Sequence, residues 1–228
     1  MITIYRSHDR EHADHGWMQS SHAFASGASN GFRSLRAVNE LRLAPGEGFD
    51  RHRHEDMEII TYVVDGIWEH SDGLNNGTVI FPGDIQRMTA GTGITHTEFN
   101  HSRTEPVHLL QIWIAPDRTA LVPSYEQRMF VPEESIGAPL LLASHDGRDN
   151  SVILHQDAEL YLCTLEPAMM LAYDLRPGRG AWIQVVRGSI MLGTTDLHAG
   201  DGVATEDESA ITLHGLAAAE VLVLELGA

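Results

Sequence analysis

Two short stretches constrain the fold more than any other part of the chain, His52-Arg-His54 and His96-Thr-Glu98. Each places two potential metal ligands two residues apart on a segment that is typical of a β-strand. Because side chains alternate between the faces of a strand, the two ligands of each pair point the same way. If the two strands lie opposite each other inside a closed sheet, three imidazoles and one carboxylate converge. That is the composition of a mononuclear metal site.

The rest of the chain has the pattern of many short strands. Residues 58–64 alternate and end at the turn signal Asp65-Gly66, and residues 109–114 are nearly all apolar, as in a strand that is buried on both faces. We expect two further strands at residues 31–39 and 41–49, the second interrupted by a turn at Ala44-Pro-Gly-Glu47. Helical periodicity is weak along the whole chain. The pattern predicts an all-β fold, either a sandwich or a barrel.

The second half of the chain repeats the pattern of the first half without its ligand pairs. Residues 182–188 resemble residues 59–66, since both are apolar strands that end in a glycine turn, and Gly200-Asp-Gly202 resembles Gly83-Asp84. The matching places in the second half carry no His-x-His and no His-x-Glu. A site without histidine or clustered carboxylate holds a first-row metal poorly. We therefore expect a second, structural half.

Charge and cysteine content exclude several classes of protein. The 228 residues include 15 lysines and arginines and 32 aspartates and glutamates; the formal net charge of −17 repels polyphosphates and argues against direct nucleic-acid binding. The single cysteine, Cys163, excludes an internal disulfide framework and a cysteine-rich zinc site. The sequence shows neither an apolar run of about 20 residues nor a signal-peptide core. We expect a cytoplasmic protein that does not bind membranes.

The order of glycines, histidines and acidic residues resembles a known superfamily. Gly46 and Glu58 flank the first histidine pair, and Gly83, Gly91 and Asn100 surround the second pair. Together they resemble the two motifs of the cupin superfamily. The ordered set is far more specific than a lone His-x-His.

A narrower resemblance covers nearly the whole chain. Residues 58–66, 83–96 and 111–113, together with residues 15–22, look like the corresponding segments of the pirin family. The resemblance implies two tandem cupin barrels of the jelly-roll type, that is, a bicupin. We expect an N-terminal metal-binding cupin domain at residues 1–125. A C-terminal cupin-like domain without a metal site would follow at residues 126–228.

The resemblance also implies which residues bind the metal. His52, His54, His96 and Glu98 would be the ligands. Glu58 belongs to the general cupin pattern, so it stays open whether it is itself a ligand or a residue that supports the ligands or lines a strand face. Because the chain holds 14 histidines, the alternative interpretation is that the four residues have a structural role only.

Three neutral imidazoles and one carboxylate suit several divalent transition metals. Ligand softness alone does not choose among Fe(II), Ni, Cu, Mn, Co and Zn. In six-coordination, four protein ligands leave two positions for a substrate oxygen and dioxygen, or for water. The pirin resemblance implies a non-haem metal that is usually iron, so we expect Fe(II).

The resemblance to bacterial pirins implies quercetin 2,3-dioxygenase activity. The substrates would be dioxygen and a flavonol-like small molecule, whose 3-hydroxyl would bind as its oxyanion. Glu98 would be a ligand, and its short reach would also allow it to accept the hydroxyl proton as a base. Oxygen would add across the 2,3 bond, open the central ring and release carbon monoxide.

The alternative hypothesis is a non-enzymatic redox sensor or regulatory protein that acts through a protein partner. The metal's oxidation state would then change a surface that the partner recognises. The size of the cavity discriminates the two hypotheses, because an enzyme needs room for a three-ring substrate and a sensor does not. The small, glycine-rich segment 23–31 favours an open cavity mouth.

Overall fold

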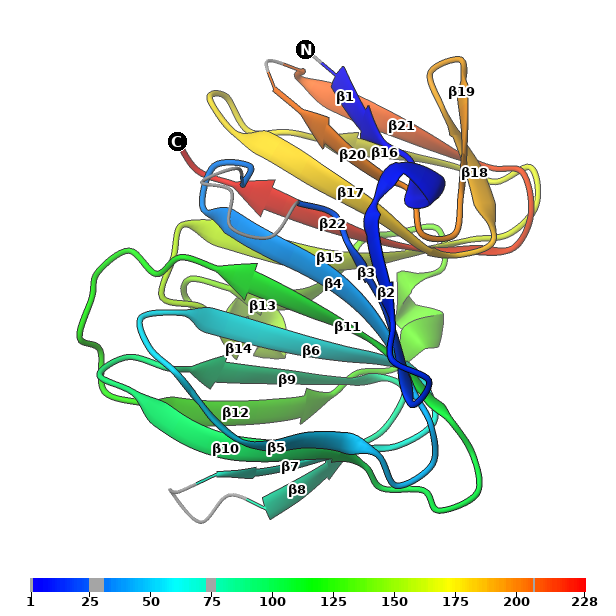
Figure 1. Ribbon diagram of the computed structural model, residues 1–228. Coiled ribbons are helices and arrows are strands. Elements are labelled where there is room, and N and C mark those ends of the chain that lie inside the picture. The colour runs from blue at the N-terminus through cyan, green and yellow to red at the C-terminus, as the bar shows by residue number, and fades with distance from the viewer. Residues whose placement is uncertain (1, 25–30, 73–76, 207) are drawn as a thin grey trace. The chain divides into compact units, whose positions relative to one another are not determined.

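The computed structural model describes residues 2–24, 31–72, 77–206 and 208–228. These residues form many short strands and three 3₁₀ turns, with strands running throughout the chain (Figure 1). The expected all-β fold is therefore confirmed. Among the described residues, no helix has both the length and the apolar character needed to cross a membrane.

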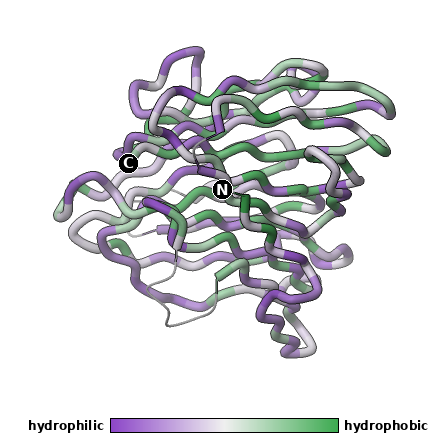
Figure 2. Tube along the Cα trace, turned by 90° about the horizontal axis from the view of Figure 1, so that it is seen from above, coloured by the Kyte–Doolittle hydropathy of each residue, from purple (hydrophilic) through white to green (hydrophobic). Residues whose placement is uncertain are grey.

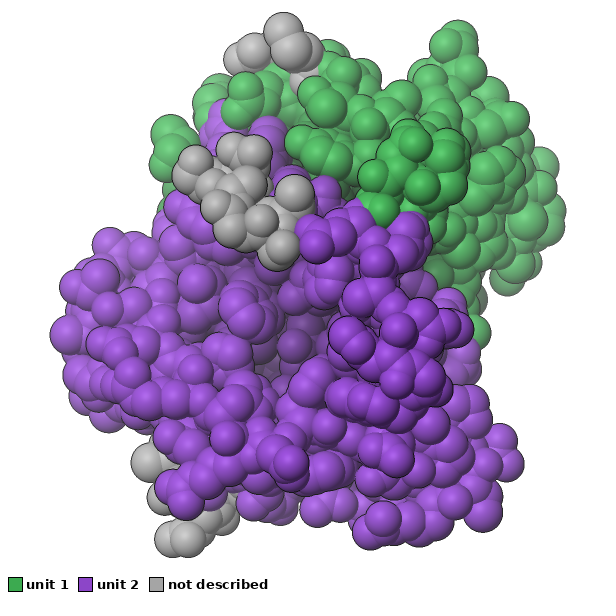
Figure 3. All heavy atoms as spheres, viewed as in Figure 1, with its two compact units in different colours: residues 1–10, 131–151, 157–228 green, residues 11–130, 152–156 purple. Residues whose placement is uncertain are grey.

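The chain forms two compact units, coloured separately in Figure 3. Unit 2 consists of residues 11–130 and 152–156, and unit 1 consists of residues 1–10, 131–151 and 157–228. The N-terminal strand therefore belongs to the same unit as the C-terminal half, where it pairs with a strand about 200 residues later in the sequence.

Unit 2 is a barrel built from two antiparallel sheets. Its larger sheet has the order β12-β9-β6-β11-β4-β3-β2, and its smaller sheet has the order β5-β10-β7-β8. The strands are β2 (Glu11–Asp14), β3 (Met18–His22), β4 (Leu35–Leu43), β5 (Gly48–His54), β6 (Glu58–Asp65), β7 (Trp68–Asp72), β8 (Gly77–Ile80), β9 (Asp84–Thr89), β10 (Ile94–Asn100), β11 (Val107–Ile114), β12 (Ser124–Met129) and β14 (Val152–Ile153).

Unit 1 repeats this plan. Its larger sheet contains the order β1-β20-β17-β22-β15-β13, and its smaller sheet has the order β16-β21-β18-β19. The elements are β1 (Ile2–Tyr5), β13 (Leu140–Ser144), β15 (Ala158–Leu165), β16 (Met170–Asp174), β17 (Gly180–Arg187), β18 (Ser189–Leu192), β19 (Thr195–His198), β20 (Gly202–Thr205), β21 (Ala210–Gly215) and β22 (Ala219–Leu226), with the 3₁₀ turns η1 (Ser7–Asp9), η2 (Pro132–Ser135) and η3 (Arg148–Asn150).

Each unit buries its own apolar core, and Figure 2 shows hydrophobic residues gathered along the strands. In unit 2, Trp68 and Ile80 of the smaller sheet pack with Leu109 of the larger sheet. In unit 1, Leu171, Ile183 and Val221 belong to a single buried cluster. Cys163 is buried in that cluster, and burial raises the pKa of its thiol to about 12.

One local expectation is wrong. Residues 31–39 and 41–49 do not form two strands, because β4 runs without a break through Leu43. The polar residue at the expected break, Glu40, fits the strand because its carboxylate binds His108 Nε2 at 2.8 Å. β4 is also paired with β3 and β11 on its two sides, and this pairing satisfies its backbone.

The buried core of unit 1 gives a stability prediction. Leu213 is fully buried in β21, whereas Leu216 just after that strand is 42% exposed. Leu213→Ala should lower the free energy of unfolding by about 2–5 kcal/mol, because it leaves a cavity. Leu216→Ala should change it by about 0.5 kcal/mol. Urea unfolding of both variants measures the difference, and equal losses would contradict this account of the core.

Candidate metal centre

The site is set by the pairing of β5 with β10. His52 lies directly opposite His96 in this antiparallel pair, and His54 lies opposite Ile94. Residues that lie directly opposite each other project from the same face of a sheet. A β-bulge between His96 and Glu98 shifts the register by one residue. Gly48 sits opposite Phe99, where an added Cβ would overlap the β10 backbone, so this close approach of the strands requires glycine.

Three imidazoles converge as a result. His52, His54 and His96 each offer a ring nitrogen within 4.8 Å of the others. The Nδ1 of His52 is 2.8 Å from the carbonyl oxygen of Asp50, so it donates its proton there and leaves Nε2 free. The buried Nε2 of His96 has no hydrogen-bond partner within the described part of the chain. An unpaired buried nitrogen is costly unless a ligand binds it.

Glu98 is grouped with His70 and His96 and not with His52 and His54, and it is held by two side chains. Gln111 Nε2 of β11 donates to both carboxylate oxygens, at 3.1 and 3.0 Å, and Trp68 Nε1 donates to Oε1 at 3.4 Å. Burial raises the pKa of Glu98, but the neighbouring His70 and His96 and the hydrogen bonds from Gln111 outweigh burial and lower it to about 2. The carboxylate is therefore ionised at neutral pH, as a metal ligand must be.

The imidazoles of His54 and His96 are neutral at the same pH. Burial lowers the pKa of His96 to about 4, against the attraction of Glu98. Burial also lowers the pKa of His54, and the neighbouring His52 adds to the effect. Neutral imidazole nitrogens and an ionised carboxylate are the forms that bind divalent cations.

A cavity of about 330 Å³ opens beside two of the three histidines, His52 and His54. His52, His54 and Glu98 line it on the metal side. Its other walls come from the N-terminal hairpin, β4, β5 and β11, namely Ala13, His15, Met18, Ser20, His22, Asn39, Leu41, Phe49, Gln111 and Trp113. The volume falls within the range of about 300–1,000 Å³ that is typical of small-molecule sites. The donor set, the unpaired His96 nitrogen and the adjoining cavity together fit one divalent transition metal.

Comparison with known proteins agrees with this fold and site. Residues 5–114 match the family Pirin, and residues 141–226 match the quercetinase C-terminal cupin domain. A quercetin 2,3-dioxygenase of Escherichia coli strain K12 is 40% identical over 231 residues, which cover 99% of each chain.

The chain belongs to the pirin family.

Two further relatives are similar to this pirin-family chain over almost its whole length. A putative quercetin 2,3-dioxygenase of Pasteurella multocida is 35% identical, covering 99% of this chain and 100% of its own. The crystal structure of the bacterial pirin YhhW of Escherichia coli in complex with nickel(II) superposes with a TM-score of 0.93 at 40% identity. It covers 100% of this chain and 99% of the other. The two tandem cupin barrels expected from the sequence are therefore confirmed.

The sequence left the role of Glu58 open, and the structure places this residue outside the metal-capable groups of the described residues. Its side chain is fully buried, and its Oε2 is 3.3 Å from both the backbone nitrogen and Nδ1 of His155. Thr89 Oγ1 is also 3.3 Å from His155 Nδ1. Glu58 therefore ties residues 152–156 to the body of unit 2. Among the described residues, Glu58 does not belong to either metal-capable group.

Sequence reasoning missed His70. The structure places it in a second metal-capable group with His96 and Glu98. Its spacing from Asp72, again two residues on one strand, was the available signal. In segment 23–31, which was expected to shape the cavity mouth, residues 25–30 lie outside the described residues.

The matching strand of unit 1 carries different chemistry. Residues Leu171 and Tyr173 lie in β16, which pairs with β21 as β5 pairs with β10. Tyr173 donates to Glu225 Oε2 at 2.5 Å, and Arg176 Nε donates to Glu225 Oε1 at 2.7 Å. Arg179 Nε lies 2.5 Å from the same oxygen. Cations and a hydroxyl thus satisfy this carboxylate, as expected of a structural half.

The depressed histidine pKa values give a pH prediction. In the metal-free protein, the free energy of unfolding should fall as the pH drops from about 6.5 towards 4, because unfolded His96 gains a proton that the folded residue, with its pKa of about 4, does not take up. One such histidine contributes up to about 1.4 kcal/mol per pH unit. Urea unfolding at about pH 7, 6 and 5 measures the slope.

His96→Asn is the control for this slope, because asparagine does not titrate. The variant should lose stability less steeply over the same pH range. Glu98 does not interfere, since its lowered pKa adds stability that is present above its ordinary value of 4.5 and is lost only as the pH falls towards about 2. Equal slopes for the variant and the parent protein would show that His96 is not buried in its neutral form.

Proposed function

We propose that this chain is a metal-dependent dioxygenase that opens the central ring of a flavonol or a related enol. The observation that carries the proposal is the convergence of three histidines, two of which, His52 and His54, line an open cavity of about 330 Å³. A water-sized cavity would have favoured a sensor. The quercetin 2,3-dioxygenase named among the relatives, at 40% identity over the full chain, supports the same activity.

In this proposal His52, His54, His96 and Glu98 hold one divalent metal. When bound, the metal would supply Lewis acidity and, if it is redox-active, the electron transfer that dioxygen chemistry needs. Fe(II) is the metal that we propose. Ni(II) is a second candidate, because it is the ion named with the relative of known structure.

The cavity walls suit a flat molecule with hydroxyl groups. Met18, Leu41 and Phe49 offer apolar surface for aromatic rings. The polar part of the wall is formed by His22, Asn39 and Ser20. His22 Nδ1 is 2.8 Å from Asn39 Oδ1, and His22 Nε2 is 3.0 Å from Ser20 Oγ. This polar group would bind ring hydroxyls and set the orientation of the substrate, because its donors and acceptors have fixed positions.

Glu98 is the proposed acceptor of the substrate's hydroxyl proton. Its carboxylate lines the cavity and is ionised at neutral pH. With a pKa of about 2 it is a weak base, so the transfer requires a strongly acidified enol hydroxyl. Gln111 would hold the carboxylate in place during the transfer through its two hydrogen bonds.

Anaerobic reconstitution tests the proposal. Metal-free protein is loaded with Fe(II), Ni(II), Cu(II) or Zn(II), and oxygen uptake and the loss of quercetin absorbance are followed after quercetin is added. We expect turnover that depends on a redox-active metal and is lost in Glu98→Ala. Stoichiometric metal binding without oxygen uptake for any metal would contradict the dioxygenase activity.

The proposed ligands give a separate prediction. His54→Ala and His96→Ala should each abolish stoichiometric metal binding and leave the fold intact, because the core of unit 2 does not depend on the metal. The melting temperatures of the metal-free variants should stay within about 4 °C of the metal-free parent, equivalent to about 1 kcal/mol. His8→Ala, at a highly exposed histidine, is the matched control and should bind metal normally. Global unfolding of both ligand variants would contradict this independence.

A further inference from the structure

His70 occupies the inner face of β7, next to the proposed ligands on β10. In this strand pair, His70 lies opposite Glu98, and Asp72 lies opposite His96. The side chains of His70 and Asp72 are both completely buried. Directly opposite residues share a face, so all four side chains project into the barrel of unit 2. His70 does not line the 330 Å³ cavity, from which a metal or substrate would approach.

The rings of His70 and His96 face each other through their Nδ1 atoms. These two nitrogens are 3.2 Å apart, a hydrogen-bond distance, so one of them carries the proton and the other accepts it. If His96 uses Nε2 as a ligand atom, its proton sits on Nδ1 and His70 accepts it. His70 then carries its own proton on Nε2, which is 3.6 Å from Asp72 Oδ2. The Nδ1 proton of His96 thus has an acceptor, whereas the Nε2 proton of His70 faces the Asp72 carboxylate at a distance longer than a hydrogen bond.

Packing fixes the His70 ring in this orientation. The ring of Tyr125 lies 5.1 Å from it, tilted by 34°. Glu98 Oε1 is 3.9 Å from its Nδ1. With packing on one side and acidic groups on two others, the ring has little freedom to turn. The orientation is therefore built into the barrel before any ligand binds.

We propose that His70 is a positioning residue for the metal site, oriented by Asp72. By accepting the Nδ1 proton of His96, it holds that imidazole in the form whose Nε2 is free to bind, and it keeps the ring aimed at His52 and His54. The inference rests on the proposed metal binding by His96. It adds two residues to that site, in the role that carboxylates and carbonyls commonly play behind histidine ligands.

Three variants of the full-length protein test the proposal. Metal-free His70→Phe keeps a ring of similar size but removes the acceptor, and its Ni(II) affinity, measured against a competing chelator, should fall by about 10- to 100-fold. His70→Asn places Oδ1 near the position of Nδ1 and should restore most of the affinity. Asp72→Asn should weaken Ni(II) binding by a smaller factor, because it affects His96 only through His70.

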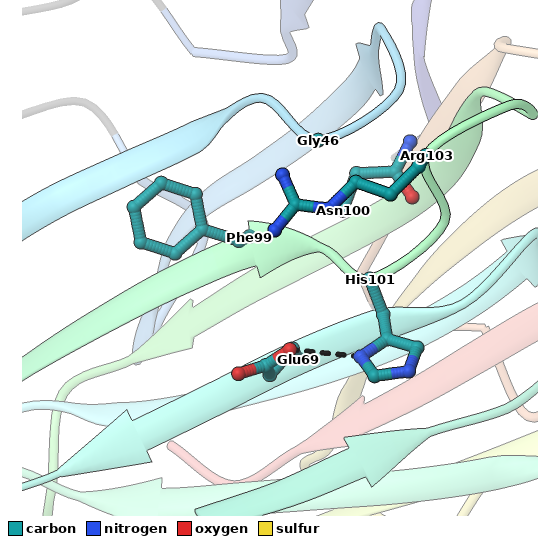
Figure 4. A pocket seen from close by; sticks show the side chains of 6 residues that line it. All are labelled: Gly46, Glu69, Phe99, Asn100, His101 and Arg103. Carbon is teal, nitrogen blue, oxygen red and sulfur yellow. Dashed lines mark hydrogen bonds and ion pairs between the residues drawn. The ribbon is translucent and has the colours of Figure 1, made fainter.

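His101→Phe is the matched control. His101 lies at the end of β10 and pairs with Glu69 at 2.8 Å beside a separate cavity of about 320 Å³ (Figure 4). This histidine is half exposed and does not belong to either metal-capable group among the described residues. The variant should bind Ni(II) as the parent does. The visible spectrum of the Co(II) form is a second readout, which should change in His70→Phe and not in the control.

Several outcomes would overturn the proposal. Parent-like Ni(II) affinity in folded His70→Phe would show that the contact with His96 has no effect on the site. Failure of a folded His70→Asn to recover affinity would mean that the loss comes from packing. Two Ni(II) ions per parent chain, with one lost in His70→Phe, would make His70 a ligand instead. If His70→Phe does not fold, His70→Asn and Asp72→Asn carry the test, and parent-like affinity in Asp72→Asn would contradict the role of Asp72.

The same titrations separate this proposal from the proposed function. A parent protein that binds no Ni(II) would overturn both. A parent protein that binds Ni(II) through the His70-dependent site and yet consumes no oxygen with quercetin would overturn the dioxygenase activity alone, and would support the role of His70.

Discussion

The antiparallel pairing of β5 with β10 is the constraint on which the site depends. His52 lies opposite His96 only in this register, and a slip by one residue would turn one histidine pair to the other face of the sheet. Glycine at position 48 permits the close approach of the two strands. The third strand of the sheet, β7, then brings His70 and Asp72 behind the ligands. The metal-capable groups therefore follow from the order and register of one small sheet.

The two units show that the same scaffold can carry either a group of potential metal ligands or a carboxylate that is fully paired with hydrogen-bond donors and cations. Their smaller sheets follow the same order, with β16-β21-β18-β19 in place of β5-β10-β7-β8. In unit 2 the inner residues include an unpaired buried histidine nitrogen. In unit 1 a tyrosine and arginines satisfy Glu225. A fold positions side chains, and their chemistry decides what the position can do.

Electrostatics give the site in unit 2 its readiness to bind a cation. Removing His54 and His96 from water favours their neutral forms, which can donate a lone pair. Glu98 is buried as well, but hydrogen bonds from neighbouring side chains keep it ionised. The same buried environment thus keeps the two imidazoles neutral and the carboxylate ionised, and these are the forms that bind a metal. Glu98 stays ionised despite its burial because it accepts several hydrogen bonds, whereas His54 and His96 do not have comparable partners for their charged forms within the described part of the chain.

The sequence by itself determined the all-β class, the two repeated halves and the close convergence of His52, His54 and His96, because alternation along a strand is a local property that spacing reveals. It did not reveal that β4 is continuous, since Glu40 looks like a break until His108 pairs with it. Nor did it reveal His70, which lies 26 residues from His96 in the chain and meets it only across β7 and β10. Tertiary structure decided those contacts, because which strands become neighbours, and in what register, depends on burying the whole core together.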